Sequence, residues 1–193
     1  MTFPTKLSLL RILLTFVTMA LLFVPTAAGK VGALVCFAVA SATDWFDGYL
    51  ARRWHQQSAL GALLDPIADK VLVLGVFLAF IQLRLVPAWM VLVIVLRELL
   101  ITGVRLYAAS RGVVLAAERQ GKNKTVSQMA TIVLILSVLV IREVTPGGLT
   151  PRVDVALQQL ILVSLWIAVL LTLVSGGSFF WRHRGVLRDA ISR

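Results

Sequence analysis

Long apolar stretches recur along the whole chain, and their length is the strongest constraint on its fold. Six of them reach about the 20 residues that an α-helix needs to cross a bilayer. They cover about residues 7–27, 31–50, 63–83, 87–109, 126–141 and 157–175. Hydrophobic residues make up 59% of the 193 positions, whereas soluble domains contain about 45–50%. We therefore expect an all-α integral membrane protein with six transmembrane helices, leaving room for a short N-terminal juxtamembrane helix, in a single domain over residues 1–193.

The distribution of Lys and Arg assigns a side to the connecting segments. If the N-terminus is cytosolic, the cytosolic segments carry twelve of the 19 Lys and Arg residues and the opposite segments carry four. This asymmetry follows the positive-inside rule, and six helices place both termini on the same side. The net charge of +10 is explained by attraction to anionic membrane lipids. No nucleic-acid-binding module accompanies it, so we do not expect nucleic acid as a partner.

Four of the nine acidic residues fall in one window between the second and third apolar stretches, at Asp44, Asp47, Asp65 and Asp69. The first pair is three residues apart and the second pair four, so each pair shares one face of its predicted helix. Carboxylates beside hydrocarbon are costly unless cations accompany them. Clustered oxygen ligands suit Mg²⁺ or Mn²⁺. The window therefore predicts a site for one or two divalent cations at the cytosolic face.

The residues between the aspartates favour a binding site over isolated helix caps. A tight connection through residues 51–62 would bring the two helix ends together. Gly48 and Gly61 leave space for a ligand or a facing helix close to the backbone, and Arg52 is a donor suited to phosphate. In the alternative interpretation Asp65, which precedes Pro66, is an N-cap, but this accounts for only one of the four aspartates.

Eight residues of this window match, at fixed spacing, the pattern Asp-x₂-Asp-Gly-x₂-Ala-Arg-x₈-Gly-x₃-Asp-x₃-Asp. The chain thereby resembles the CDP-alcohol phosphotransferase family, and the resemblance extends over nearly its whole length. Residues 121–129 (GKNKTVSQM) and the start PTKLSLLR are similar to segments of the members that use glycerol 3-phosphate, as are Arg97-Glu98 with Arg105. The start departs from the family in two places: Thr2 stands where Asn is usual, and Ser8 stands in place of Thr but keeps a hydroxyl.

The resemblance implies a reaction and a set of site residues. The reaction is transfer of the phosphatidyl group from CDP-diacylglycerol to sn-glycerol 3-phosphate, giving phosphatidylglycerol phosphate and CMP at the cytosolic face of the plasma (inner) membrane. By the same resemblance the four aspartates are ligands of Mg²⁺ or Mn²⁺, expected as two ions, and Asp69 is also the general base. The residues expected to bind CDP are Ser8, Asp47, Gly48, Ala51, Arg52 and Gly61. The family also suggests a homodimer.

The acceptor site is predicted from cations near the cytosolic ends of the fourth and fifth helices, namely Arg105, Lys122 and Lys124. A charged acceptor such as glycerol 3-phosphate requires cationic contacts, whereas an uncharged alcohol does not. Two alternatives stay open: Arg105 could form a buried ion pair with Glu98, and the lysines could simply follow the positive-inside rule. We interpret Arg97, deep in its predicted span, as a structural residue that pairs or hydrogen-bonds within the bundle.

Other functions compete with this one. The same chemistry could use inositol phosphate or phosphatidylglycerol as the acceptor. A divalent-cation transporter could use the same carboxylates, but transporter sites tend to lie near the bilayer midplane in broken helices. These aspartates lie at one interface beside Arg52 and two glycines, which disfavours transport. A structural scaffold would leave the acidic cluster unexplained.

Overall fold

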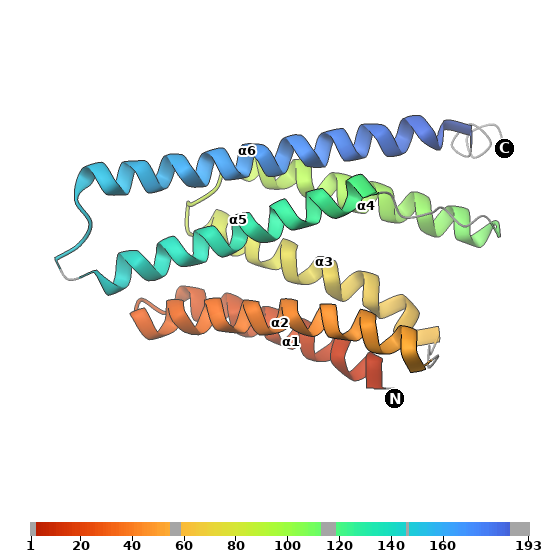
Figure 1. The fold of residues 1–193 in the computed structure, drawn as a ribbon, viewed down its shortest axis with the longest axis horizontal. Coiled ribbons are helices and arrows are strands. Elements are labelled where there is room, and N and C mark those ends of the chain that lie inside the picture. Colours follow the sequence, from red (N-terminus) through yellow and green to blue (C-terminus); the bar gives the residue numbers. More distant parts are fainter. Residues whose placement is uncertain (1–2, 55–58, 113–118, 146, 186–193) are drawn as a thin grey trace. The chain divides into compact units, whose positions relative to one another are not determined.

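The computed structural model describes residues 3–54, 59–112, 119–145 and 147–185, and over these ranges the chain forms six α-helices. They are α1 (Phe3–Phe23), α2 (Ala27–Trp54), α3 (Ala59–Gln82), α4 (Ala88–Ser110), α5 (Arg119–Val144) and α6 (Pro151–Arg182) (Figure 1). The side chains of residues 3–5, 44–54, 59–66, 69 and 119–122 are outside this description. No strand occurs within the described ranges. The prediction of an all-α fold is therefore confirmed.

The helices are distributed over two compact units. Unit 1 comprises Met1–Leu85 and Ile132–Gln158, and unit 2 comprises Val86–Thr131 and Gln159–Arg193. Helices α1, α2 and α3 belong to unit 1 and α4 belongs to unit 2, whereas α5 and α6 each contribute to both units. The expectation of a single domain over residues 1–193 stays a prediction.

Three helices in the described ranges are long and apolar enough to cross a membrane. These spans are Lys6–Phe23, Asn123–Val144 and Pro151–Arg182, and two shorter apolar segments cover Ala27–Thr43 and Lys70–Gln82. Many large apolar side chains on these helices face outward; those of Leu170 and Val174 on α6 are 54% and 62% exposed. Exposed apolar surface of this extent is typical of a protein that contacts lipid. The chain is a membrane protein, and six complete spans stay a prediction.

The helices extend beyond most of the apolar stretches that predicted them, because polar turns continue the helix past the hydrocarbon. Helix α2 continues to Trp54 and α3 begins at Ala59, so the predicted connection over residues 51–62 is shorter, with only 55–58 between the helices. Asp65 consequently lies inside α3, and its interpretation as an N-cap is wrong. Pro66 has no amide hydrogen to donate along this helix.

A tight turn separates α1 from α2 and ends α1 earlier than predicted, at Phe23. Thr26 caps α2, since its Oγ1 accepts a hydrogen bond from the amide of Gly29 at 3.1 Å. The buried Lys30 donates from Nζ to the carbonyl oxygen of Leu22 at 2.5 Å. This ammonium satisfies one of the carbonyls that the last turn of a helix leaves without a partner.

Helix α1 presents a polar stripe to the interior of unit 1. Its members recur at spacings of three and four residues and are all buried: Ser8, Arg11, Thr15 and Thr18. Thr15 and Thr18 donate their hydroxyl hydrogens to the carbonyls of Arg11 and Leu14 in their own helix, at 2.9 and 2.8 Å. A Cβ built on Gly75 of α3 would lie 2.8 Å from Cγ2 of Thr15. The absence of a side chain at Gly75 therefore permits α1 and α3 to pack closely.

The substitution Gly75→Ala should destabilise the protein. The new Cβ would also lie 3.3 Å from Sδ of Met19, and the Thr15 side chain is short, β-branched and buried, so it cannot move aside. We expect a loss of about 1–3 kcal/mol from overpacking, measured as a lower thermal midpoint in detergent.

Gly103→Ala in α4 is the matched control, because among the described residues nothing beyond its own helix backbone and chain neighbours lies within 4 Å of its Cβ position. Helix propensity should make that variant more stable, by up to about 1 kcal/mol. Adding Thr15→Ser to Gly75→Ala removes Cγ2 and should restore most of the lost stability. A Gly75→Ala protein as stable as the Gly103→Ala protein would contradict the close α1–α3 contact.

Candidate functional site

The backbone of the acidic window is helical on both sides of residues 55–58. Asp44 and Asp47 lie toward the end of α2, and Asp65 and Asp69 lie in the first half of α3. The other predicted residues of this window follow the same division: Gly48, Ala51 and Arg52 are on α2, and Gly61 is on α3. All eight side-chain positions lie outside the described residues. The convergence of the four carboxylates therefore stays a prediction. The backbone places the two pairs of aspartates on consecutive helices of unit 1.

The donor chemistry of this window fits a hard divalent cation. The four acidic positions supply only carboxylate oxygens, which Mg²⁺ and Mn²⁺ accept as ligands. Positions 44 and 47 share a face of α2, and positions 65 and 69 share a face of α3, because both segments are helical.

Ser8 and Arg11 lie at the level of the acidic window within unit 1. Short connections make α1 antiparallel to α2 and α2 antiparallel to α3, so α1 and α3 run in the same direction (Figure 1). Thr15 of α1 meets Gly75 of α3. Counting seven residues back along each helix, about 10 Å at 1.5 Å per residue, brings Ser8 level with the backbone just before Asp69. Ser8 is 1% exposed and Arg11 is 2% exposed, and both have polar partners.

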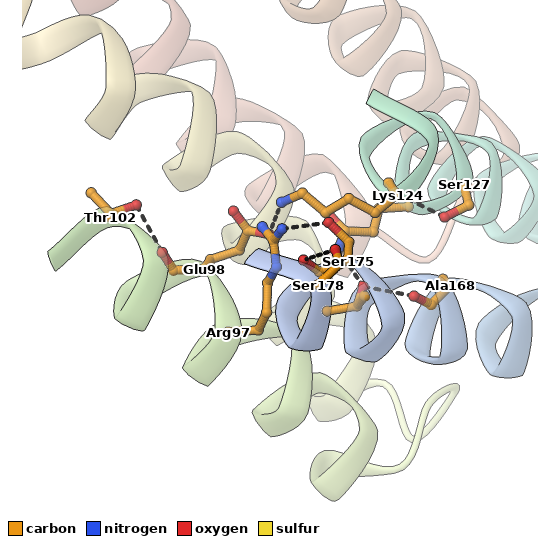
Figure 2. A network of polar contacts seen from close by, with 10 residues as sticks. Arg97, Glu98, Thr102, Lys124, Ser127, Ala168, Ser175 and Ser178 are labelled. Atoms are coloured by element: carbon orange, nitrogen blue, oxygen red, sulfur yellow. Dashed lines mark hydrogen bonds and ion pairs between the residues drawn. The ribbon is translucent and has the colours of Figure 1, made fainter. Parts of the chain in front are cut away.

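A second polar centre connects three helices of unit 2 (Figure 2). Oε1 of Glu98 on α4 accepts hydrogen bonds from Nζ of Lys124 on α5 and, at 3.0 Å, from Nη1 of Arg97. Nη2 of Arg97 donates to Oγ of Ser175 on α6 at 2.7 Å. Glu98 is 5% exposed and Lys124 is 6% exposed. One carboxylate oxygen therefore holds two cations in a buried setting.

The polar contacts continue along one face of α5. Gln128 donates from Nε2 to Oγ1 of Thr172 at 3.0 Å, and Thr172 donates to the carbonyl of Ala168 at 2.6 Å. The hydroxyl of Thr131 is shared between the carbonyl of Ser127 in its own helix, at 2.9 Å, and the carbonyl of Ser164 on α6, at 3.2 Å. Lys124 is on the same face, four residues before Gln128. The N-terminal half of α5 is thus joined to α6 by hydrogen bonds, which are directional, as well as by apolar contact.

The described residues give two of the three predicted acceptor cations different partners. Arg105 is exposed, and its guanidinium carbon lies 5.7 Å from the ring centroid of Phe179, a distance typical of a cation–π contact. Lys122 is on α5, but its side chain lies outside the described residues. Lys124 is paired with Glu98. The assignment of all three to an acceptor phosphate stays a prediction.

The partners of Glu98 differ from the pair that the sequence offered. The sequence allows an ion pair between Glu98 and Arg105, but the Glu98 carboxylate contacts Arg97 and Lys124 instead. The interpretation of Arg97 as a structural residue is confirmed by its contacts with Glu98 and Ser175. The signal for a buried pair was present, since Glu98 is the one acidic residue of α4 and an acid within an apolar helix requires a cation.

Comparison with known sequences identifies the class of protein. The sequence profile of the CDP-alcohol phosphatidyltransferase family matches residues 1–176. The chain belongs to this family, and it is a transferase.

Individual relatives share a more specific name. The chain is 36% identical, over 97% of its own length and 97% of the relative, to the CDP-diacylglycerol–glycerol-3-phosphate 3-phosphatidyltransferase of Bacillus subtilis strain 168. It is also 36% identical to the protein of the same name from Escherichia coli K12, over 69% of this chain and 75% of that relative.

Two adjacent glycines of α6 provide a test of the Arg97 contact. A Cβ on Gly176 would lie 3.2 Å from Cγ of Arg97. At Gly177 the described chain places nothing within 4 Å of the corresponding position apart from the helix's own backbone and chain neighbours. Both Gly→Ala substitutions gain similar helix propensity, so their difference isolates the contact. We expect Gly176→Ala to be about 1 kcal/mol less stable than Gly177→Ala, measured by thermal midpoints in one detergent. Equal midpoints would show that Arg97 does not pack against Gly176 in solution.

Proposed function

We propose that this chain transfers the phosphatidyl group of CDP-diacylglycerol to a hydroxyl of sn-glycerol 3-phosphate, producing phosphatidylglycerol phosphate and CMP. The similarity to the Bacillus subtilis relative, over 97% of both chains, carries this proposal. The match of residues 1–176 to the family includes the complete acidic window.

The chemistry assigned to the chain is a displacement at phosphorus. The acceptor hydroxyl oxygen forms a bond to the phosphorus of the phosphatidyl group, and the bond from that phosphorus to the oxygen of CMP breaks. Asp69 takes the hydroxyl proton as general base, and CMP leaves with the bridging oxygen. Positioning and charge neutralisation contribute most of the catalysis in reactions of this type.

The charged side chains of the window bind and orient the diphosphate. Asp44, Asp47, Asp65 and Asp69 are the residues that would hold Mg²⁺ or Mn²⁺, expected as two ions. When bound, such ions neutralise the charge of the diphosphate and of the leaving group. The residues proposed to bind CDP are Ser8, Asp47, Gly48, Ala51, Arg52 and Gly61. The buried position of Ser8, level with the window, supports its inclusion.

The acceptor phosphate is assigned to the cations of α4 and α5, namely Arg105, Lys122 and Lys124. A cationic site discriminates in favour of a phosphorylated acceptor, because a phosphate forms charge-assisted hydrogen bonds with ammonium and guanidinium groups.

We also propose how the enzyme sits in the membrane. All six helices span the plasma membrane, and both termini and the acidic window face the cytosol, in agreement with the excess of Lys and Arg on that side. The CDP head group would then meet the window while the acyl chains stay in the bilayer. Membrane lipids surround the helices, and the protein is proposed to be a homodimer on the basis of the family resemblance.

The acceptor can be identified by CMP release. Purified protein in detergent with CDP-diacylglycerol and Mg²⁺ should release CMP with glycerol 3-phosphate, and not with inositol phosphate, serine or phosphatidylglycerol. Chelation of the metal with EDTA should abolish the release, and added Mg²⁺ or Mn²⁺ should restore it. Turnover with a different acceptor would retain the chemistry and reject the assigned acceptor. No CMP with any acceptor would favour the cation-transport alternative.

Asp69→Asn should separate catalysis from binding. The amide cannot take the hydroxyl proton, so we expect kcat to fall by about 10²–10⁴-fold, while binding of CDP-diacylglycerol is largely retained. The matched control is Asp154→Asn on α6, whose carboxylate pairs with Arg142 at 2.8 Å and should leave kcat unchanged. An equal loss of binding and turnover in Asp69→Asn would reduce Asp69 to a metal ligand without a role as base.

A further inference from the structure

We propose that Glu98 is a positioning residue for the acceptor phosphate. Its carboxylate holds the ammonium of Lys124 at the place from which Lys124 binds the phosphate of glycerol 3-phosphate. This inference rests on the proposed function. The inference adds to that function a residue, Glu98, that does not contact the substrate and affects acceptor binding through Lys124.

Burial makes the position of Lys124 dependent on a partner. Its side chain is only 8% exposed and that of Glu98 is 7% exposed, so solvent does little to stabilise either charge. A lysine ammonium sits on a flexible four-carbon stem, and fixing it in one position costs rotamer entropy. An ammonium on such a stem tends to move toward water unless polar groups hold it. The contact with Glu98 instead holds it at one point beside α4.

Glu98 is itself held in place from two sides. Nη1 of Arg97 donates to the same oxygen, Oε1, at 3.0 Å, and Nη2 of Arg97 is tied to Oγ of Ser175 on α6 at 2.7 Å. In the same helix, Thr102 donates to the backbone carbonyl of Glu98 at 2.7 Å. Figure 2 shows these contacts converging from α4, α5 and α6. A carboxylate anchored in this way can hold the ammonium of Lys124 in a fixed position.

The three charged residues of this centre suit a phosphate ligand better than a neutral ion pair would. Arg97, Glu98 and Lys124 together carry one net positive charge, the sign that attracts phosphate. Arg105, another predicted acceptor residue, lies two helical turns after Glu98 on α4 and so shares its side of the helix. A buried ion pair by itself adds little stability compared with apolar residues of the same volume. A role in acceptor binding therefore explains the buried carboxylate better than a contribution to stability does.

A double-mutant cycle on the full-length enzyme tests the inference. We would measure kcat and the KM for each substrate in wild type, Glu98→Gln, Lys124→Ala and the double variant. Glu98→Gln should raise the KM for glycerol 3-phosphate about tenfold and change the KM for CDP-diacylglycerol less than about twofold. Because Glu98 acts through Lys124, the double variant should be no worse than Lys124→Ala alone.

A pair of serine variants tests the same inference without altering charge, and so remains informative if Glu98→Gln does not fold. Ser175→Ala removes the hydrogen bond between Nη2 of Arg97 and α6 and should raise the KM for glycerol 3-phosphate about threefold. Ser164→Ala is the matched control on α6. Within the part of the chain that the structure describes, its hydroxyl donates to the carbonyl of Ile161 in the same helix at 2.8 Å, so the substitution should leave this KM unchanged.

Several results would overturn the inference. Effects of Glu98→Gln and Lys124→Ala that simply add in the double variant would show that Glu98 acts independently. An unchanged KM in Lys124→Ala would remove that residue from the acceptor site and Glu98 with it. Equal losses for both substrates, together with a lower thermal midpoint, would identify a structural ion pair. Failure of the wild-type enzyme to release CMP with glycerol 3-phosphate would be a failure of the proposed function, seen before any variant is made.

Discussion

A carboxylate buried among apolar helices costs several kcal/mol unless a cation meets it, and unit 2 is organised around this requirement. Two cations satisfy this requirement at Glu98: Lys124 of α5, and Arg97, which also donates to Ser175 on α6. Apolar contact is non-directional, so it would permit these helices to slide or rotate against one another. The shared carboxylate oxygen fixes their register. Gly176 allows Arg97 to reach α6 because a side chain at this position would lie close to Cγ of Arg97.

Unit 1 achieves close packing in a different way, by small residues and by hydroxyls that bond within their own helix. Thr15 and Thr18 satisfy their hydroxyl groups on α1, so Thr15 can face α3 without an unsatisfied hydrogen. Gly75 receives Thr15 directly. This contact lies six residues, or about 9 Å along the helix, from Asp69. The segment of α3 that carries the proposed general base is thus near a close contact between α1 and α3, and such support limits displacement of its backbone.

The number and class of the helices could be predicted from the sequence because both follow from the length of apolar runs. Their ends could not, since α2 continues to Trp54 after its apolar stretch has ended and α3 begins at Ala59 before its own stretch starts. Thr26 likewise caps a new helix within a short turn. The acidic window was recognisable because its residues are local in sequence. The partner of Glu98 was not, because Arg97, Arg105 and Lys124 are equivalent by charge alone. Only the packing of α5 beside α4 selects Lys124, and that packing depends on contacts spread along both helices.

The shared oxygen of Glu98 also resolves an apparent conflict in the proposed role of Lys124. A carboxylate that pairs with an ammonium competes with any phosphate for it, so a Glu–Lys pair would be a poor acceptor site if the carboxylate had no other partner. Arg97 donates to the same Oε1 and withdraws part of its negative charge from Lys124. The ammonium is then oriented without being fully neutralised. Orientation of a cation before the substrate arrives lowers the entropy lost on binding, and the remaining positive charge is available to the phosphate.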